Sequence, residues 1–176
     1  MGKSYEFRTN AAPPNHRIYE TYLRDIGLEK SHFGDLAKRG LTSEQIQNAQ
    51  FATKPPNKAS RAITTLGKLE NEFGTQMNGV AGFYIDEKSK HLTQMKTVGM
   101  LISVRNFNGH IESLLSRNDN AKIGISGKVE NKYVAFSSKD KPKGNKVFQT
   151  THCPIIKGAP KKVCGPTARI TEGILK

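Results

Sequence analysis

The first half of the chain repeats hydrophobic residues with the period of an α-helix. Four stretches show this spacing: 18–26, 31–37, 42–49 and 59–73. Gly27 and Gly74 follow two of them, as glycine commonly does where a helix ends. Ser31 is the expected cap of the second helix, and Thr42 with Gln45 has the spacing of a capping box at the start of the third. The fourth helix is expected to bury one stripe: Ala59, Ala62, Ile63, Leu66, Leu69 and Phe73.

The second half changes to short hydrophobic runs between glycines, lysines and polar residues. The runs are 98–104, 110–117, 132–138, 146–150, 161–164 and 168–172, after an apolar piece at 79–85. Their length predicts strands, and the polar turn at 106–109 predicts that the first two form a hairpin. Helices followed by mainly antiparallel strands indicate an α+β fold.

This pattern divides the chain into three ranges. Residues 1–14 are expected to be a flexible arm, residues 15–74 a helical lobe, and residues 75–176 an antiparallel β subdomain with basic loops. No apolar run approaches the roughly 20 residues of a membrane span, and no signal peptide is recognisable. Two cysteines in this length favour a reducing compartment, so the cytoplasm is the expected location and no membrane partner is expected.

Charge is concentrated in the second half. The chain has 28 Lys and Arg against 15 Asp and Glu, a net charge of +13, and residues 120–176 hold 12 of the cations and 3 of the acids. One explanation is a solvated surface whose lysines protect sheet edges from aggregation. The other is a groove for a phosphate backbone, which the Gly-rich loops and the scarcity of acids favour. Nucleic acid is therefore the first candidate partner.

Basic residues also stand at the ends of the expected strands. Arg105 and Arg117 end the two strands of the hairpin, and Lys132 with Tyr133 begins the next strand. A guanidinium grips a phosphate through two parallel hydrogen bonds, and an ammonium adds a point charge. If the strands are neighbours, Arg105, Arg117 and Lys132 are expected to converge on one phosphate path. Spacing alone favours the simpler explanation that these side chains face water.

The order of these motifs resembles the catalytic core of bacterial DnaG-type primases. The runs that carry the resemblance are VRNFNGHIESLLSR, NKYVAFSS and ARITEGILK, preceded by GVAGFY and a helical lead-in. The sequence resembles more closely the TOPRIM-associated, primase-like replication proteins of plasmids, phages and integrative elements. The resemblance covers about residues 15–176, and it implies a primase-core-like basic subdomain that ends in the first TOPRIM strand.

The resemblance also assigns roles. Arg105, Arg117 and Lys132 match basic positions that line the template and nucleotide groove of primases, and Glu172 matches the TOPRIM glutamate. In complete enzymes that glutamate works near Mg²⁺, which a later Asp-x-Asp pair mainly holds. This sequence has no Asp-x-Asp pair, so the resemblance implies a truncated protein without catalytic residues or a cofactor. Mg²⁺ is expected only if the chain is part of a complete primase.

The favoured function is non-catalytic binding of single-stranded DNA or RNA in a phage or mobile element. The residues expected to contact phosphates are Arg105, Arg117, Lys132, Lys139, Lys141, Lys143 and Lys146. Tyr133 or Phe136 is expected to stack on a base. One alternative is an inhibitor of a host nucleoprotein such as an RNA-guided nuclease, in the manner of an anti-CRISPR protein. The other is a fragment of an active DNA primase.

Zinc is a further candidate ligand. His152, Cys153 and Cys164 offer donor atoms, with His91 or His110 as additional ones. Structural zinc sites show Cys or His pairs at close spacing, which these residues lack. Ordinary thiols and surface histidines are therefore the favoured interpretation.

Overall fold

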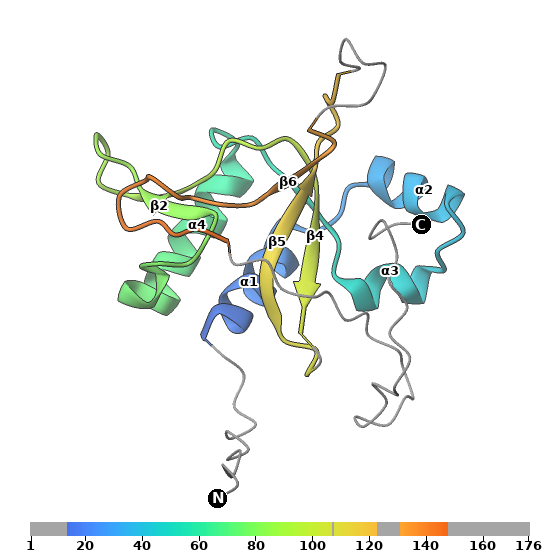
Figure 1. Ribbon diagram of the computed structural model, residues 1–176, viewed down its shortest axis with the longest axis horizontal. Coiled ribbons are helices and arrows are strands. Elements are labelled where there is room, and N and C mark those ends of the chain that lie inside the picture. Colours follow the sequence, from blue (N-terminus) through green and yellow to red (C-terminus); the bar gives the residue numbers. More distant parts are fainter. Residues whose placement is uncertain (1–13, 107, 123–130, 148–176) are drawn as a thin grey trace, which may run out of the picture.

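The computed structural model describes residues 14–106, 108–122 and 131–147, and Figure 1 shows their arrangement. The helices are α1 (Pro14–Ile26), α2 (Lys30–Lys38), α3 (Ser43–Ala49), α4 (Ser60–Phe73) and the short 3₁₀ helix η1 (Gly74–Met77). The strands are β1 (Ala52–Lys54), β2 (Phe83–Ile85), β3 (Leu92–Gln94), β4 (Gly99–Arg105), β5 (Ile111–Arg117) and β6 (Tyr133–Ala135). The predicted α+β fold, with helices first and strands after them, is confirmed.

Four strands form one antiparallel sheet in the order β1-β4-β5-β6, and β2 pairs with β3 in a separate ribbon. The predicted hairpin is β4 and β5. β1 was not predicted, because it lies inside the range expected to be a helical lobe. Its residue Ala52 pairs with Leu101 of β4. The two halves of the chain therefore share one sheet, while the exact domain boundaries stay a prediction.

Helices cover both faces of the sheet (Figure 1). Successive residues of a strand point to opposite faces. Leu101 of β4 packs with α1 and α4 in the larger hydrophobic cluster, whereas its neighbours Met100 and Ile102 pack with Leu36 of α2 and Ile46 of α3. This double coverage explains why every residue of β4 is buried.

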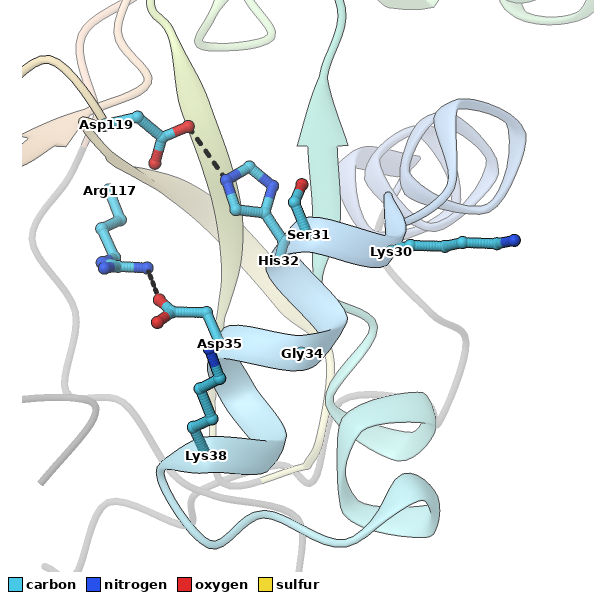
Figure 2. A pocket seen from close by; sticks show the side chains of 8 residues that line it. All are labelled: Lys30, Ser31, His32, Gly34, Asp35, Lys38, Arg117 and Asp119. Carbon is cyan, nitrogen blue, oxygen red and sulfur yellow. Dashed lines mark hydrogen bonds and ion pairs between the residues drawn. The ribbon is translucent and has the colours of Figure 1, made fainter.

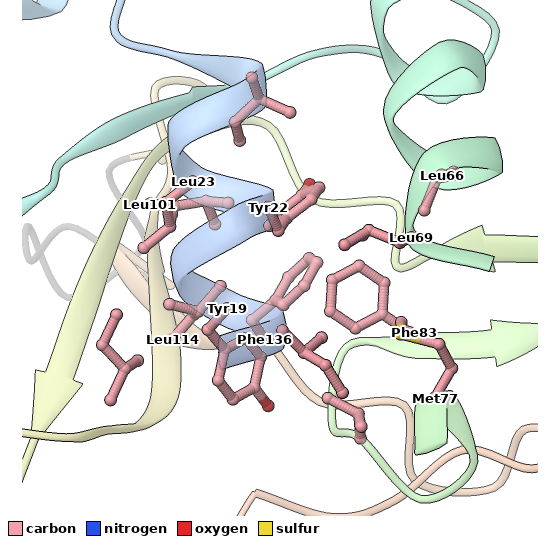
Figure 3. Packing of buried hydrophobic residues seen from close by; sticks show 14 of the residues in the cluster. Tyr19, Tyr22, Leu23, Leu66, Leu69, Met77, Phe83, Leu101, Leu114 and Phe136 are labelled. Carbon is pink, nitrogen blue, oxygen red and sulfur yellow. The ribbon is translucent and has the colours of Figure 1, made fainter. Parts of the chain in front are cut away.

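Aromatic rings fill the larger cluster where α1 meets the β2–β3 ribbon (Figure 3). The Phe83 ring meets the Tyr22 ring edge to face, with centroids 5.0 Å apart and planes at 89°. It meets the Phe136 ring in the same way, at 5.6 Å and 87°. Such edge-to-face pairs stabilise a core beyond the area that they bury. Phe83 thus attaches the ribbon to the rest of the molecule.

Local signals placed three helix ends correctly. Gly27 follows α1 with a φ of +63°, and Gly74 follows α4 with a φ of +50°, both of which favour glycine. The capping box is present: the Gln45 N–H donates to the Thr42 hydroxyl over 3.2 Å, and the Thr42 N–H donates to the Gln45 side-chain oxygen over 2.8 Å.

Other expectations were wrong in detail. Glu29, not Ser31, is the N-cap of α2, and its side chain makes no capping hydrogen bond. Ile63 was expected in the buried stripe of α4 but is 61% exposed, because its direction around the helix lies outside the arc that faces the core. β6 is shorter than the expected strand at 132–138, because it ends at Ala135, although the Phe136 N–H still donates to the Leu114 carbonyl over 2.9 Å.

Several expectations fall on residues that the structure does not describe. They are residues 1–13 of the arm expected at 1–14, the strands at 161–164 and 168–172, most of the strand at 146–150, Glu172, and the zinc candidates His152, Cys153 and Cys164. Pro14, the last residue of the expected arm, instead begins α1. Among the described helices, none combines the length and the apolar character needed to cross a bilayer.

Candidate nucleic-acid interface

The register of the hairpin separates Arg105 from Arg117. Arg105 lies opposite Ile111 at one end, and Arg117 lies opposite Met100 at the other. At about 3.3 Å per residue, the seven-residue strands put the two ends roughly 20 Å apart. The expected convergence of both arginines with Lys132 is therefore wrong. The strands β4 and β5 are antiparallel, so the arginines at their C-terminal ends lie at opposite ends of the hairpin. Arg117 and Lys132 do share one end, where the Asn118 N–H donates to the Lys132 carbonyl over 2.8 Å.

Arg105 is a buried residue that ties elements together. Its side chain donates to the Gly109 carbonyl over 2.7 Å and to the Gln50 side-chain oxygen, and the residue is 4% exposed. Burial lowers the pKa of the Arg105 guanidinium, and the nearby Glu20 carboxylate opposes that shift. Arg105 thus joins the hairpin turn to the end of α3. Its contact with phosphate stays a prediction, and a phosphate would have to reach a covered side chain.

Arg117 is held by an acid of α2. It donates to the Asp35 carboxylate over 2.6 Å (Figure 2), and the Arg39 guanidinium lies 3.6 Å from the same oxygen. The hydrogen bond from Arg117 is the main reason why the pKa of Asp35 is lowered. The Arg117 side chain is 18% exposed and the Asp35 side chain 40%, so the carboxylate is the more accessible member of the pair.

A second link joins α2 to the sheet beside this pair. The His32 ring has one nitrogen 2.9 Å from the Asp119 carboxylate and the other 2.7 Å from the Thr53 hydroxyl. That hydroxyl also accepts the Glu29 N–H over 2.9 Å. Figure 2 shows the links from Arg117 to Asp35 and from His32 to Asp119 as dashed lines. These four residues line one hollow of about 590 Å³. The hollow is lined by Lys30, Ser31, His32, Gly34, Asp35, Lys38, Arg117 and Asp119.

The lysine segment, residues 131–147, holds five lysines and one acid, Asp140. After β6 it returns along the β2–β3 ribbon, where the Ile85 N–H donates to the Pro142 carbonyl over 3.0 Å and the Gly79 N–H donates to the Lys143 carbonyl over 2.9 Å. Figure 1 shows this segment in orange beside β2. Its exposed lysines are Lys132, Lys139, Lys141, Lys143 and Lys146.

Two of these lysines lie over aromatic rings. The Lys132 ammonium is 5.9 Å from the centroid of the Tyr133 ring, and the Lys141 ammonium is 5.7 Å from that of Tyr84. Tyr133 is 38% exposed, so it is available for stacking. Phe136 is fully buried in the core, so the expectation that it stacks on a base is wrong. A lysine beside an accessible ring offers an ammonium group and an aromatic face at one position.

Lys54, at the end of β1, is a buried ionisable residue that sequence reasoning missed. Its ammonium donates to the Pro55 carbonyl over 3.1 Å and to the Asn57 side-chain oxygen over 2.9 Å. Among the described residues, no carboxylate forms an ion pair with it. Burial lowers the pKa of Lys54 from 10.5 to about 8. The folded protein therefore binds the Lys54 proton less tightly than the unfolded chain does.

This difference predicts a stability that rises with pH. Above about pH 8 the folded protein releases the Lys54 proton while the unfolded chain keeps it up to about 10.5, so the unfolded state binds more protons. Lys54→Met should remove up to about 1.4 kcal/mol per pH unit from that rise. Urea unfolding of both proteins between about pH 7.5 and about 9.5 measures the difference. Equal slopes would contradict the burial of the amine.

The range between about pH 7.5 and about 9.5 lies below the pH at which two buried tyrosines would lower the stability of the folded protein. Burial raises the pKa of Tyr19 and Tyr22 from 10.0. Stability contributed by these two phenols is therefore lost only as the pH rises above about 10.

The described residues contain no group of three His, Cys, Asp or Glu side chains that a metal ion could bridge. His91 is exposed in a turn. The His110 ring instead packs against His16, with centroids 5.0 Å apart.

Neither the profile of a known family nor a curated protein matches the sequence. Solved structures do match. The RNA polymerase domain of the Mycobacterium tuberculosis primase DnaG, in complex with a double-stranded DNA that has a 6-nucleotide overhang, gives a TM-score of 0.51 at 10% identity, over 80% of this chain and 41% of that one. The same domain with another double-stranded DNA gives 0.50 at 11% identity, over 80% and 42%. A DnaG catalytic core gives 0.45 at 15% identity, over 77% and 39%.

The chain thus spans about two fifths of the length of the primase structures that it matches. The likeness shows the fold: the described residues adopt a primase-like α+β architecture.

Proposed function

We propose that this chain is a primase-like protein of a phage or mobile element that binds single-stranded nucleic acid without catalysing phosphoryl transfer. The observation that carries the proposal is the lysine segment, in which five exposed lysines stand against the single acid Asp140 between residues 132 and 146. Charge of one sign on an exposed stretch attracts a polyanion and raises the rate at which it associates.

The geometry favours a single strand over a duplex. Bases of a single strand are free to stack on aromatic rings, and Tyr133 is exposed beside Lys132. Tyr84 of β2, beside Lys141, offers a second ring next to the same segment. Arg117 lies opposite Tyr133 in the sheet register, so an arginine stands on the neighbouring strand at the first of these positions.

The solved structures support a nucleic-acid partner, because two of the matching primase domains are in complex with DNA. The absence of catalysis is proposed from the sequence, which has no Asp-x-Asp pair to hold Mg²⁺. We assign no step to a metal ion.

The proposal predicts how binding should respond to loss of the ring-bound lysines. Lys132→Ala/Lys141→Ala is expected to weaken binding of a labelled oligothymidine by about tenfold near 0.1 M salt. It should also reduce the slope of log affinity against log salt by about 1.4, since each lost contact with a single strand removes about 0.7. Fluorescence anisotropy titrations at several salt concentrations measure both quantities.

Two further variants serve as controls. One tests whether the position of the lost lysines matters, and the other tests whether base stacking contributes to binding. Lys58→Ala/Lys68→Ala removes the same charge from the exposed surface near and within α4 and should leave the slope nearly unchanged. Tyr133→Leu should weaken binding by about fivefold or more with an unchanged slope, because stacking releases no counterions.

The outcome decides between the functions. Equal losses in the two double-lysine variants would contradict the lysine segment as the interface. No salt-dependent binding to DNA or RNA of either strandedness would contradict the proposed function, and the inhibitor hypothesis would then be tested by capture of a host nucleoprotein.

A further inference from the structure

Arg117 and Lys132 lie at one end of the sheet. At this end the acid Asp35 of α2 is bound to Arg117, which bears on how Arg117 could bind a phosphate. Arg117 lies beside Tyr133 in the register and beside the start of the lysine segment, so it is the arginine best placed to extend the proposed interface. Yet its guanidinium donates to the Asp35 carboxylate over 2.6 Å. In the free protein, Asp35 therefore occupies a hydrogen-bonding position of this arginine.

Carboxylates and phosphates bind a guanidinium in the same way, through oxygens placed along its N–H groups. The Asp35 side chain is 40% exposed and the Arg117 side chain 18%. An incoming phosphate therefore meets the acid more readily than the arginine. Arg39, 3.6 Å from the same carboxylate, helps to hold Asp35 in this position.

The rest of α2 is fixed without Asp35. Leu36 is fully buried in the smaller hydrophobic cluster, and His32 is bound on one side to Thr53 and on the other to Asp119. Rotation of the Asp35 side chain alone would free the guanidinium, while the helix stays in place. Figure 2 shows that the two links are separate, with Asp35 and Asp119 reaching different partners.

We propose that Asp35 is an internal competitor for the phosphate position on Arg117, so that the free protein masks one cation of its own interface. This inference rests on the proposed function and adds a regulatory residue to it. A ligand must displace the carboxylate before it gains the arginine. A polyanion already held by the lysine segment can do so because its next phosphate is delivered at high local concentration, whereas a free monophosphate lacks that advantage.

The test is Asp35→Asn, which keeps the shape of the side chain and removes its charge. The variant is expected to bind a labelled oligothymidine about three- to tenfold more tightly than the wild type near 0.1 M salt, since an unmasked arginine adds one charge-assisted contact. Asp25→Asn is the matched control. Asp25 also pairs with two surface cations, Arg24 and Lys68, so this change alters the net charge equally but away from the hollow.

A double-mutant cycle locates the effect. Arg117→Ala should weaken binding, and Asp35→Asn should bring no gain beyond the Asp25→Asn control when Arg117 is already alanine. Asp35→Ala provides a second substitution that removes the acid, and thermal melting verifies that each variant is folded.

The outcomes separate this inference from the function beneath it. If the wild type binds and Asp35→Asn gains no more than Asp25→Asn, or gains equally without Arg117, the masking role is overturned while the proposed function stands. If neither the wild type nor Asp35→Asn binds any oligonucleotide, both are overturned. Binding by Asp35→Asn alone would support masking in its strongest form.

Discussion

Phe83→Ala is expected to lower the free energy of unfolding by about 3–5 kcal/mol. The Phe83 side chain is fully buried, and its ring meets Tyr22 and Phe136 edge to face. Truncation removes the apolar contacts and leaves a cavity that rings on either side cannot fill, because both are anchored in other elements. Urea unfolding followed by circular dichroism measures the change.

The control for this substitution is Ile63→Ala on α4. Ile63 is 61% exposed, so its loss should change the free energy of unfolding by no more than about 0.5 kcal/mol. A cost below about 1 kcal/mol for Phe83→Ala would show that the β2–β3 ribbon unfolds separately from the sheet, contrary to the shared core.

Gly99→Ala is expected to destabilise the protein by about 3 kcal/mol or more. Gly99 begins β4 with a φ of +112°, where L side chains are strained, and a Cβ atom there would lie 2.1 Å from the Arg117 carbonyl oxygen. The obstacle is backbone of the paired strand, which cannot rotate away as a side chain could. Chemical denaturation gives the stability, and oligonucleotide binding gives the effect on the end of the sheet that carries Arg117.

Gly67→Ala on α4 is the matched substitution. No atom lies within 4 Å of the Cβ that it would add, and alanine favours a helix over glycine by about 0.5–1 kcal/mol. This variant should therefore be as stable as the wild type or more so. A Gly99→Ala protein of wild-type stability would mean that β4 and β5 do not approach as described.

The helices could be predicted because their signals are local. Gly27, Gly74 and the capping box of Thr42 and Gln45 act within one turn of the chain, and the structure uses them as expected. β1 has three residues and no alternation of polar and apolar positions. Only its pairing with β4 makes it a strand, and that partner lies far along the sequence.

The candidate site was predicted in part. The exposure of the lysines between 132 and 146 follows from the polar and charged composition of that stretch. The ends of the hairpin strands were also placed correctly. The separation of Arg105 from Arg117 follows from the hairpin itself and was available in the sequence. The burial of Arg105 was not, because its partner Gln50 lies at the end of α3.

The hollow beside α2 had no local signal either. His32, Thr53 and Asp119 come from a helix, a strand and a loop that are brought together only by the completed sheet. The same is true of Asp35 and Arg117. Contacts of this kind depend on tertiary packing, so periodicity and spacing cannot reveal them.

The pairing of β1 with β4 also determines the order in which the sheet can be assembled. Closing a loop restricts the chain, and the entropy lost grows with the number of residues enclosed. The β4–β5 hairpin encloses only residues 106–110, whereas pairing β1 with β4 encloses residues 55–98. Loop closure therefore favours formation of the hairpin before β1 docks, and we expect the hairpin to form first. Because Thr53 of β1 carries the hydroxyl that holds both Glu29 and His32, we expect the hollow beside α2 to be completed after the hairpin.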